Sequence, residues 1–123
     1  MKKNILTISS FLLVGFSSLA QSQNITTNQG NLVVRPNTLF TTYFNFENAT
    51  TGNVINDGEM HFYGHYKNEG LFSYTTNTTT GYTVFEGKMG EMQKIDGTSP
   101  SSFYDVLFNK SQSVTAFHLT NDI

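Results

Sequence analysis

Three histidines and a few neighbouring carboxylates are the side chains of this chain best suited to metal or acid–base chemistry. His61 and His65 are four residues apart, a spacing that would suit zinc on a helix. On a strand the same spacing places both on one face but about 13 Å apart, at about 3.3 Å per residue. A metal site needs three or four converging ligands, and His118 is distant in sequence. We therefore expect solvent-facing strand histidines, no metal ion and no cofactor.

The carboxylates near these histidines are Asp57, Glu59 and Glu69. Their spacing matches neither an EF-hand loop nor the Asp-Gly ladders of calcium-binding repeats. A glycosidase needs two carboxylates across a cleft, and a chain this short is a poor host for one. The sequence has no Gly-x-Ser-x-Gly motif, no cysteine nucleophile and no phosphate-binding loop. We therefore expect no catalytic residues and a protein that is not an enzyme.

Aromatic side chains beside the histidines are the best candidates for a binding surface. We predict that Tyr43, His61, Tyr63 and His65 are exposed together and contact a partner. Aromatic residues on a solvent-facing strand can stack on sugar rings or contact other proteins. The alternative is that a loop or an adjacent strand covers both tyrosines. Glycans or other surface proteins are the expected partners.

The segment that must position these residues is the stretch from Gly52 to Tyr74. It contains two similar turns, Asn56-Asp57-Gly58 and Asn68-Glu69-Gly70, and each turn leads into an aromatic-rich strand. Glycine enters such tight turns without the steric cost of a Cβ atom. We expect the two turns to occupy equivalent positions in successive coils. Alternation predicts that one set of side chains faces the core (Met60, Phe62, Gly64, Tyr66) and the other faces water (Glu59, His61, Tyr63, His65).

The composition indicates an all-β protein. The chain contains 11 Phe and 6 Tyr, and charged residues make up 13% of it, about half the usual share. Aromatic and β-branched residues with Gly and Asn between them are typical of short strands and tight turns. A further alternating run predicts that Phe40, Thr42, Phe44 and Phe46 share an inner face.

Two architectures fit short strands at this spacing. In an antiparallel β-sandwich, successive strands pair through hairpins. In a β-solenoid or β-helix-like fold, each strand stacks on its equivalent one coil later. The repeated Asn-x-Gly turn and the brief strands favour the solenoid, with the sandwich as the alternative. Open strand edges of a solenoid would also favour self-association.

The N-terminal residues resemble a secretory export signal. Residues 1–20 have the pattern of a secretory signal peptide, with Lys2 and Lys3 before an apolar run and small residues up to Ala20. The run is too short and too polar to span a membrane stably, so we expect no membrane span after cleavage. We expect residues 21–38 to form a flexible approach segment. The β-rich domain would cover residues 39–123, and the final Asn-Asp-Ile suggests that it is incomplete at its C-terminus.

Charge narrows the possible partners. The chain has 7 basic and 9 acidic residues, and cleavage after Ala20 would remove two of the basic ones, giving a net charge of about −4 with neutral histidines. Such a surface repels phosphate backbones, so nucleic acid is not an expected partner. The chain contains no cysteine, so its stability must come from core burial or assembly.

The segments GNVINDGEMHFYGHYKNEGLF, QKIDGTSPSSFYDVLFN and AFHLTNDI carry a resemblance. The chain resembles the N-terminal part of large secreted surface proteins of the Bacteroidetes, associated with type nine secretion, in which such β-repeat segments recur. The resemblance covers residues 52–123 and implies an adhesin-like β-repeat protein at the cell surface. The C-terminal sorting domain of that family has no counterpart here.

Together these features predict an exported, non-enzymatic structural or adhesion-type module of a cell-surface protein. One alternative is a carbohydrate-binding β-sandwich that uses exposed tyrosines. Another is the leading coil of a polysaccharide-degrading enzyme whose catalytic part lies downstream.

Overall fold

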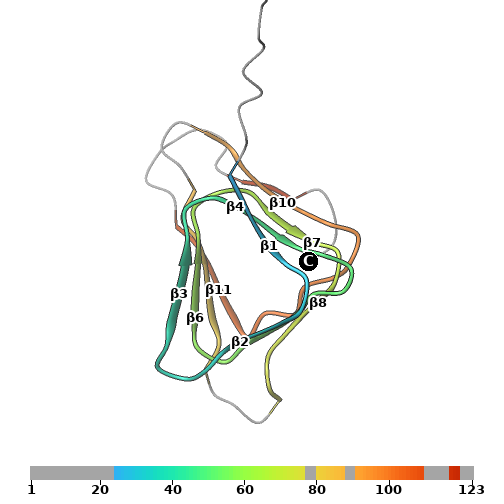
Figure 1. The fold of residues 1–123 in the computed structure, drawn as a ribbon. Helices are drawn as coiled ribbons and strands as arrows, with labels where there is room; N and C mark the ends of the chain where they lie inside the picture. Colours follow the sequence, from blue (N-terminus) through green and yellow to red (C-terminus); the bar gives the residue numbers. More distant parts are fainter. Residues whose placement is uncertain (1–23, 77–79, 88–90, 110–116, 120–123) are drawn as a thin grey trace, which may run out of the picture.

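The computed structural model describes residues 24–76, 80–87, 91–109 and 117–119. This part of the chain is all-β and forms a parallel β-solenoid with three sheets, which enclose a roughly triangular cross-section (Figure 1). The predicted β-solenoid is therefore confirmed, and the antiparallel sandwich is not formed. No helix in the described residues is long and apolar enough to cross a bilayer.

Each sheet is built from strands of successive coils. Sheet A has the spatial order β1 (Ile25–Asn28), β4 (Asn45–Asn48), β7 (Tyr66–Asn68), β10 (Gln93–Asp96) and β12 (Phe117–Leu119). Sheet B has the order β2 (Asn31–Val34), β5 (Asn53–Asn56) and β8 (Leu71–Ser73). Sheet C has the order β3 (Leu39–Thr42), β6 (Glu59–Phe62), β9 (Tyr82–Phe85) and β11 (Asp105–Phe108).

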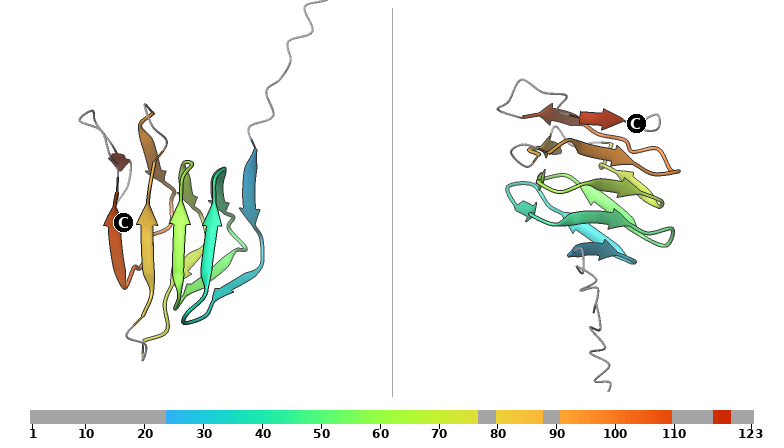
Figure 2. Two further views of the ribbon diagram at one scale, coloured as in Figure 1. Left: turned by 90° about the vertical axis from the view of Figure 1, so that its left-hand side faces the viewer. Right: turned by 90° about the horizontal axis from the view of Figure 1, so that it is seen from above.

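The chain passes through sheets A, B and C in turn and then begins the next coil. All strand pairs are parallel, so each strand lies beside its equivalent in the coil before and the coil after. Figure 2 shows the strands of sheet C side by side and the coils stacked on one another. In the fourth coil, the place of a sheet B strand is taken by a single bridge between Phe72 and Ser101.

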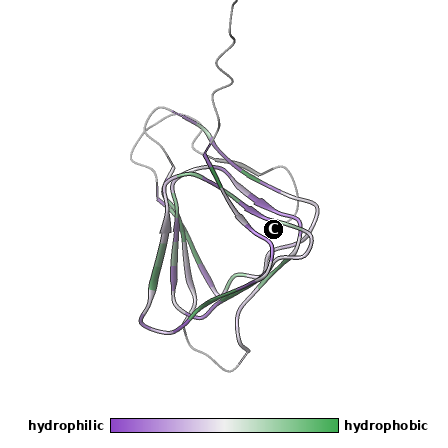
Figure 3. Ribbon diagram, viewed as in Figure 1, coloured by the Kyte–Doolittle hydropathy of each residue, from purple (hydrophilic) through white to green (hydrophobic). Residues whose placement is uncertain are grey.

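The strands follow from alternating burial. In β6 the side chains of Met60 and Phe62 are completely buried, while Glu59 is exposed and His61 is partly exposed. The same alternation occurs in β4 and β5, and hydrophobic and hydrophilic residues occur in all three sheets (Figure 3). Because each side of the triangle buries one face of its strands, the core is a column of apolar side chains along the solenoid axis.

Aromatic rings dominate this column. Phe62 and Phe85 stack with ring centroids 5.6 Å apart, and Phe85 stacks on Phe108 at 5.4 Å. Tyr66 lies in the middle of the column and contacts Phe46 and Phe62. Its hydroxyl group forms a 2.7 Å hydrogen bond with Ser101 Oγ, so this buried polar group is satisfied.

The corner between sheets A and B is held by a ladder of asparagine side chains. Asn28 Nδ2 donates to Asn48 Oδ1 at 2.9 Å, and Asn48 Nδ2 donates to Asn68 Oδ1 at 2.8 Å. Asn68 Nδ2 then donates to Ser101 Oγ at 3.0 Å. We call these four residues the asparagine ladder. Asn48 and Asn68 are fully buried, and the bonds between coils satisfy their amide groups without water.

The expected equivalence of the two Asn-x-Gly turns is wrong. Gly70 lies at the corner between sheets A and B, where a Cβ atom would come closer than 3.0 Å to the carbonyl oxygen of Gly52 in the coil before. Gly58 lies at the corner between sheets B and C, next to the carbonyl oxygen of Arg35. In both turns the glycine N–H is within hydrogen-bond distance of the asparagine Oδ1, at 3.2 Å for Gly58 and 3.3 Å for Gly70. The two sequences look alike because both corners need a tight turn in which the asparagine side chain accepts a hydrogen bond from the glycine N–H.

Two further expectations are corrected. Phe44 does not share the inner face with Phe40 and Phe46, because the chain bends between β3 and β4, and Phe44 is 47% exposed. Within residues 21–38, expected to be a flexible approach segment, β1 and β2 pair in register with β4 and β5. The described β-structure therefore begins before residue 39. The first 23 residues, including the signal peptide expected at residues 1–20, lie outside the described part.

Candidate functional site on the outer face of sheet C

The outer face of sheet C carries three rows of side chains that cross the coils. The strand register places Leu39, Glu59, Tyr82 and Asp105 in the first row, and Thr41, His61, Val84 and Leu107 in the second. Continuing the same register by two residues gives a third row of Tyr43, Tyr63, Glu86 and Asn109. Three of the four predicted binding residues therefore lie on this face, namely Tyr43, His61 and Tyr63.

His61 is held between two carboxylates. Its Nε2 lies 2.6 Å from Glu59 Oε1, and its Nδ1 lies 2.8 Å from Glu86 Oε1. The second oxygen of Glu86 accepts a hydrogen bond from Asn109 Nδ2 at 2.8 Å. Each ring nitrogen therefore faces one carboxylate oxygen, and which nitrogen donates depends on the tautomer. The network joins β6 to the residues that follow β9 and β11.

One residue of the second row, Val84, is buried although it lies on the outer face next to His61. Val84 is 2% exposed although it lies outside the central core cluster. It is paired in register with His61 on one side and Leu107 on the other. The partly buried His61 therefore lies beside a buried apolar side chain on this face, which reduces the competition of water for the hydrogen bonds of the histidine.

Tyr43 and Tyr63 stack on each other. Their ring centroids are 4.7 Å apart with an interplanar angle of 28°. Two nearly parallel rings at this distance must face each other, because side by side their atoms would overlap. The separation equals the spacing of neighbouring strands, so the ring faces point along the solenoid axis and each tyrosine covers one face of the other. The pair is therefore not a flat platform for a sugar ring, although Tyr43 is 63% exposed.

The surroundings of Tyr63 favour its neutral form. Partial burial, followed by the nearby Glu86 carboxylate and then by Tyr43, raises the pKa of the Tyr63 phenol above its ordinary value. The phenol therefore keeps its proton, and with it a hydrogen-bond donor, at physiological pH.

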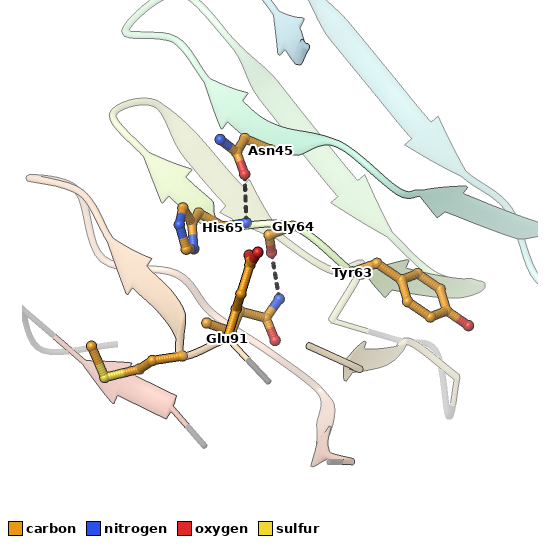
Figure 4. A pocket seen from close by; sticks show the side chains of 7 residues that line it. Asn45, Tyr63, Gly64, His65 and Glu91 are labelled. Carbon is orange, nitrogen blue, oxygen red and sulfur yellow. Dashed lines mark hydrogen bonds between the residues drawn. The ribbon is translucent and has the colours of Figure 1, made fainter. Parts of the chain in front are cut away.

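His65 lies apart from the other predicted residues, at the corner between sheets C and A (Figure 4). Its backbone N–H donates to Asn45 Oδ1 at 2.9 Å, and its Nδ1 accepts a hydrogen bond from the Lys94 N–H at 3.1 Å. The small cavity beside it has a volume of about 20 Å³, enough for about one water molecule. His65 therefore braces a corner between coils, and the cavity is too small for an organic ligand.

Sequence reasoning missed the groove along the first row. A groove of about 520 Å³ runs past Leu39, Glu59, Tyr82 and Asp105 and is bounded by the corner residues of sheets B and C. Tyr82 and Asp105 are not among the predicted residues, because no local pattern marks them. Tyr82 lies one coil after Glu59, and Asp105 lies one coil after Tyr82. Knowledge of the coil lengths would therefore have placed the three residues in one row.

The described residues contain no group of three or more His, Cys, Asp or Glu side chains that could hold a metal ion. The two carboxylates nearest His61 each bind a different ring nitrogen, so the three residues form a chain of hydrogen bonds and do not converge on one point. The arrangement can position donors, acceptors and ring edges for a ligand on the surface.

Comparison with protein-family models, with curated proteins and with solved structures found no match to this chain.

Proposed function

We propose that this protein is an exported, non-enzymatic structural or adhesion-type module of a cell-surface protein, with the outer face of sheet C as its contact surface. The observation that supports this proposal best is the uniform strand register, which holds rows of side chains from four coils on one rigid face. Rigid elements position a contact surface with little loss of conformational entropy on binding. The sequence resemblance to Bacteroidetes surface proteins supports the same proposal.

Export is the first part to test. The full chain and a version without residues 2–20 would be produced in a Gram-negative host, and cell fractions would be compared. We expect the full chain outside the cytoplasm with Gln21 as its first residue, measured by mass spectrometry, and the shortened chain inside. An uncleaved full chain retained in the cytoplasm would contradict export.

Adhesion is the second part. Beads coated with the purified protein would be passed over surfaces coated with extracellular polysaccharide or with bacterial cells, and retention under flow would be measured. Beads coated with a Gly70→Ala variant, which we expect to be poorly folded, are the control. Retention that requires the folded protein supports the proposal, and equal retention of both bead types would contradict it.

Self-association is a related proposal. The outermost described strand of sheet C, β11, has four exposed residues, with Val106, Leu107 and Phe108 each 38–41% exposed. Strand edges with unpaired backbone groups and apolar side chains are templates for another chain. Sedimentation should detect oligomers that disappear when Leu107 is changed to Lys. A strictly monomeric wild-type protein would contradict this.

The alternative function is carbohydrate binding. The specific observation in its favour is the groove along the first row, which combines an exposed tyrosine with carboxylates. The stacked pair Tyr43–Tyr63 favours it less, since each ring already covers the other.

A further inference from the structure

The groove along the first row crosses all four strands of sheet C. It takes one side chain from each of β3, β6, β9 and β11, namely Leu39, Glu59, Tyr82 and Asp105. Four neighbouring strands at about 4.8 Å spacing give it a length of about 14 Å along the solenoid axis. Its volume of about 520 Å³ lies in the range of small-molecule binding sites, about 300–1,000 Å³. One wall is the glycine-containing corner at Gly58 and Gly81.

Tyr82 is the aromatic side chain at the centre of this groove. It is 37% exposed, and no aromatic ring of the described residues stacks on it. Its backbone is fixed, because its N–H donates to the Gly58 carbonyl at 2.7 Å. Unlike Tyr43 and Tyr63, Tyr82 therefore has a ring that starts from a fixed backbone position and is not covered by a second aromatic ring.

The two charged side chains among the described residues of the groove lining, Glu59 and Asp105, are both carboxylates and therefore hydrogen-bond acceptors. Asp105 is exposed, and its carboxylate forms no hydrogen bond to the described residues, although its backbone N–H is anchored to the Gly81 carbonyl at 3.0 Å. Glu59 is fixed through Oε1 by His61. Among the described residues that line the groove, none is a lysine, arginine or histidine. The groove therefore repels anionic ligands and offers acceptors to neutral or hydroxyl-rich ones.

We propose that this groove binds a short segment of a neutral glycan chain, laid across the coils with about one sugar unit per coil. The strand spacing of about 4.8 Å is close to the length of one sugar unit in an extended glycan. The ring of Tyr82 packs against the apolar face of the central unit, and the carboxylates of Glu59 and Asp105 accept hydrogen bonds from hydroxyl groups on either side. This inference rests on the proposed adhesion function and names its ligand class.

The test is titration of the purified protein with oligosaccharides of increasing length, followed by calorimetry or NMR. The probes are cello- and malto-oligosaccharides as neutral chains, oligogalacturonate as the anionic chain and oligolysine as the basic peptide. We expect a neutral chain to bind, affinity to rise up to about three sugar units and then level off, given the groove length of about 14 Å. Oligogalacturonate should not bind.

Two variants locate the site. Tyr82→Ala should weaken glycan binding about tenfold or more, as expected for loss of a central aromatic contact, while Tyr82→Phe should retain most of it. Asp105→Asn should weaken binding by a smaller factor without affecting folding, because its side chain has no partner among the described residues. Matched controls are Tyr104→Ala and Glu47→Gln, which change an exposed aromatic and an acid outside the groove lining. A melting curve for each variant separates lost binding from lost folding.

Neutral glycan binding that Tyr82→Ala removes and the controls leave intact supports the inference. Binding of oligolysine alone, unchanged affinity in Tyr82→Ala, or no binding of any oligosaccharide by the folded protein would overturn it. If folded-protein beads still adhere to surfaces while no glycan binds, the ligand class is wrong and the adhesion proposal stands; if neither occurs, both fail.

Discussion

The asparagine ladder and the outer face of sheet C both have equivalent positions in successive coils. The residue type is kept at the ladder positions and varies on the outer face. At the ladder asparagine recurs at Asn28, Asn48 and Asn68, and the fully buried Asn48 and Asn68 each form side-chain hydrogen bonds to the coil before and the coil after. On the outer face, the first row changes from Leu39 to Glu59 to Tyr82, and all three side chains are exposed. Burial explains the contrast, since an unsatisfied buried amide costs about 1–3 kcal/mol, whereas an exposed position can bond to water. The buried asparagine ladder fixes how the coils stack, whereas the exposed residues of sheet C can vary and are available to contact a ligand.

The largest expected effect breaks the stacked corner. Gly70→Ala places a Cβ closer than 3.0 Å to the carbonyl oxygens of Gly52 and Ala49, so the backbone must move and the free energy of unfolding should fall by about 3 kcal/mol or more. Gly30→Ala is the matched control, because a Cβ there meets nothing within 4 Å. Urea unfolding of both variants measures the difference. Equal midpoints would mean that the coils do not approach as described.

The second prediction removes one rung of the asparagine ladder. Asn48→Ala deletes the bonds to Asn28, Asn68 and the Leu71 carbonyl, and should lower the free energy of unfolding by about 2–3 kcal/mol. Asn31→Ala removes an exposed asparagine that bonds to Asn53, and should change it by less than about 0.5 kcal/mol. Chemical denaturation measures the free energy of unfolding of both variants. If both substitutions lower it by the same amount, the buried side-chain hydrogen bonds of the asparagine ladder do not determine the stability of the stacked coils.

The third prediction compares a fully buried tyrosine, Tyr66, with a partly buried one, Tyr63, through the pH dependence of stability. Burial is the main cause that raises the pKa of Tyr66 far above its ordinary value, and the Ser101 hydrogen bond opposes it only partly. The folded protein then holds this proton more tightly than the unfolded chain does. Stability is therefore fully present below about pH 10 and falls by about 1.4 kcal/mol per pH unit above it, until the pKa of folded Tyr66 is reached.

Tyr66→Phe tests this directly. The substitution costs about 1 kcal/mol at neutral pH through the lost hydrogen bond, but it should flatten the alkaline decline of the wild-type protein. The partly buried counterpart, Tyr63→Phe, should flatten it far less, although the pKa of Tyr63 is also raised. Unfolding curves measured between neutral and alkaline pH provide the comparison. Parallel profiles for wild type and Tyr66→Phe would rule out Tyr66 as the source of the decline.

The smallest expected effect is on the outer face. Tyr43→Ala removes the exposed partner of the Tyr43–Tyr63 stack and should lower the free energy of unfolding by about 1 kcal/mol or less. Thermal melts of Tyr43→Ala and of Phe46→Ala, which empties a fully buried position, would set this loss beside one of about 3–5 kcal/mol. A Tyr43 effect as large as that of Phe46 would show that the stack belongs to the core.

The fold could be predicted from the sequence because buried and exposed side chains alternate within each short strand. Alternation correctly placed Met60, Phe62 and Tyr66 in the core and Glu59 on the surface. It failed at Phe44, which lies on the bend between β3 and β4 and is exposed, although Thr42 before it and Phe46 after it are buried. No glycine or proline marks that bend. The repeat length was misjudged for a related reason, since the same Asn-x-Gly turn serves two corners. The signal that would have corrected it is the recurrence of asparagine at Asn28, Asn48 and Asn68 with a constant spacing of 20 residues.

The candidate site was harder to foresee, because its parts come from different coils. Tyr43 and Tyr63 are 20 residues apart, as one full coil requires, and the pair could be found once that spacing was known. The partners Glu86 and Asn109 follow longer coils, from Tyr63 to Glu86 and from Glu86 to Asn109, so a constant spacing would miss them. Only the three-dimensional register joins residues whose separations differ.

The variable spacing between coils has one more consequence. Sheet A partners are 20 residues apart between Phe46 and Tyr66 but 29 apart between Tyr66 and Ile95, yet the strands still pair. Extra residues are accommodated between strands, where they leave the hydrogen-bonded ladders intact. Natural insertions and deletions should therefore accumulate at these linkers, which gives such a protein a route to diversify its surface without redesigning its frame.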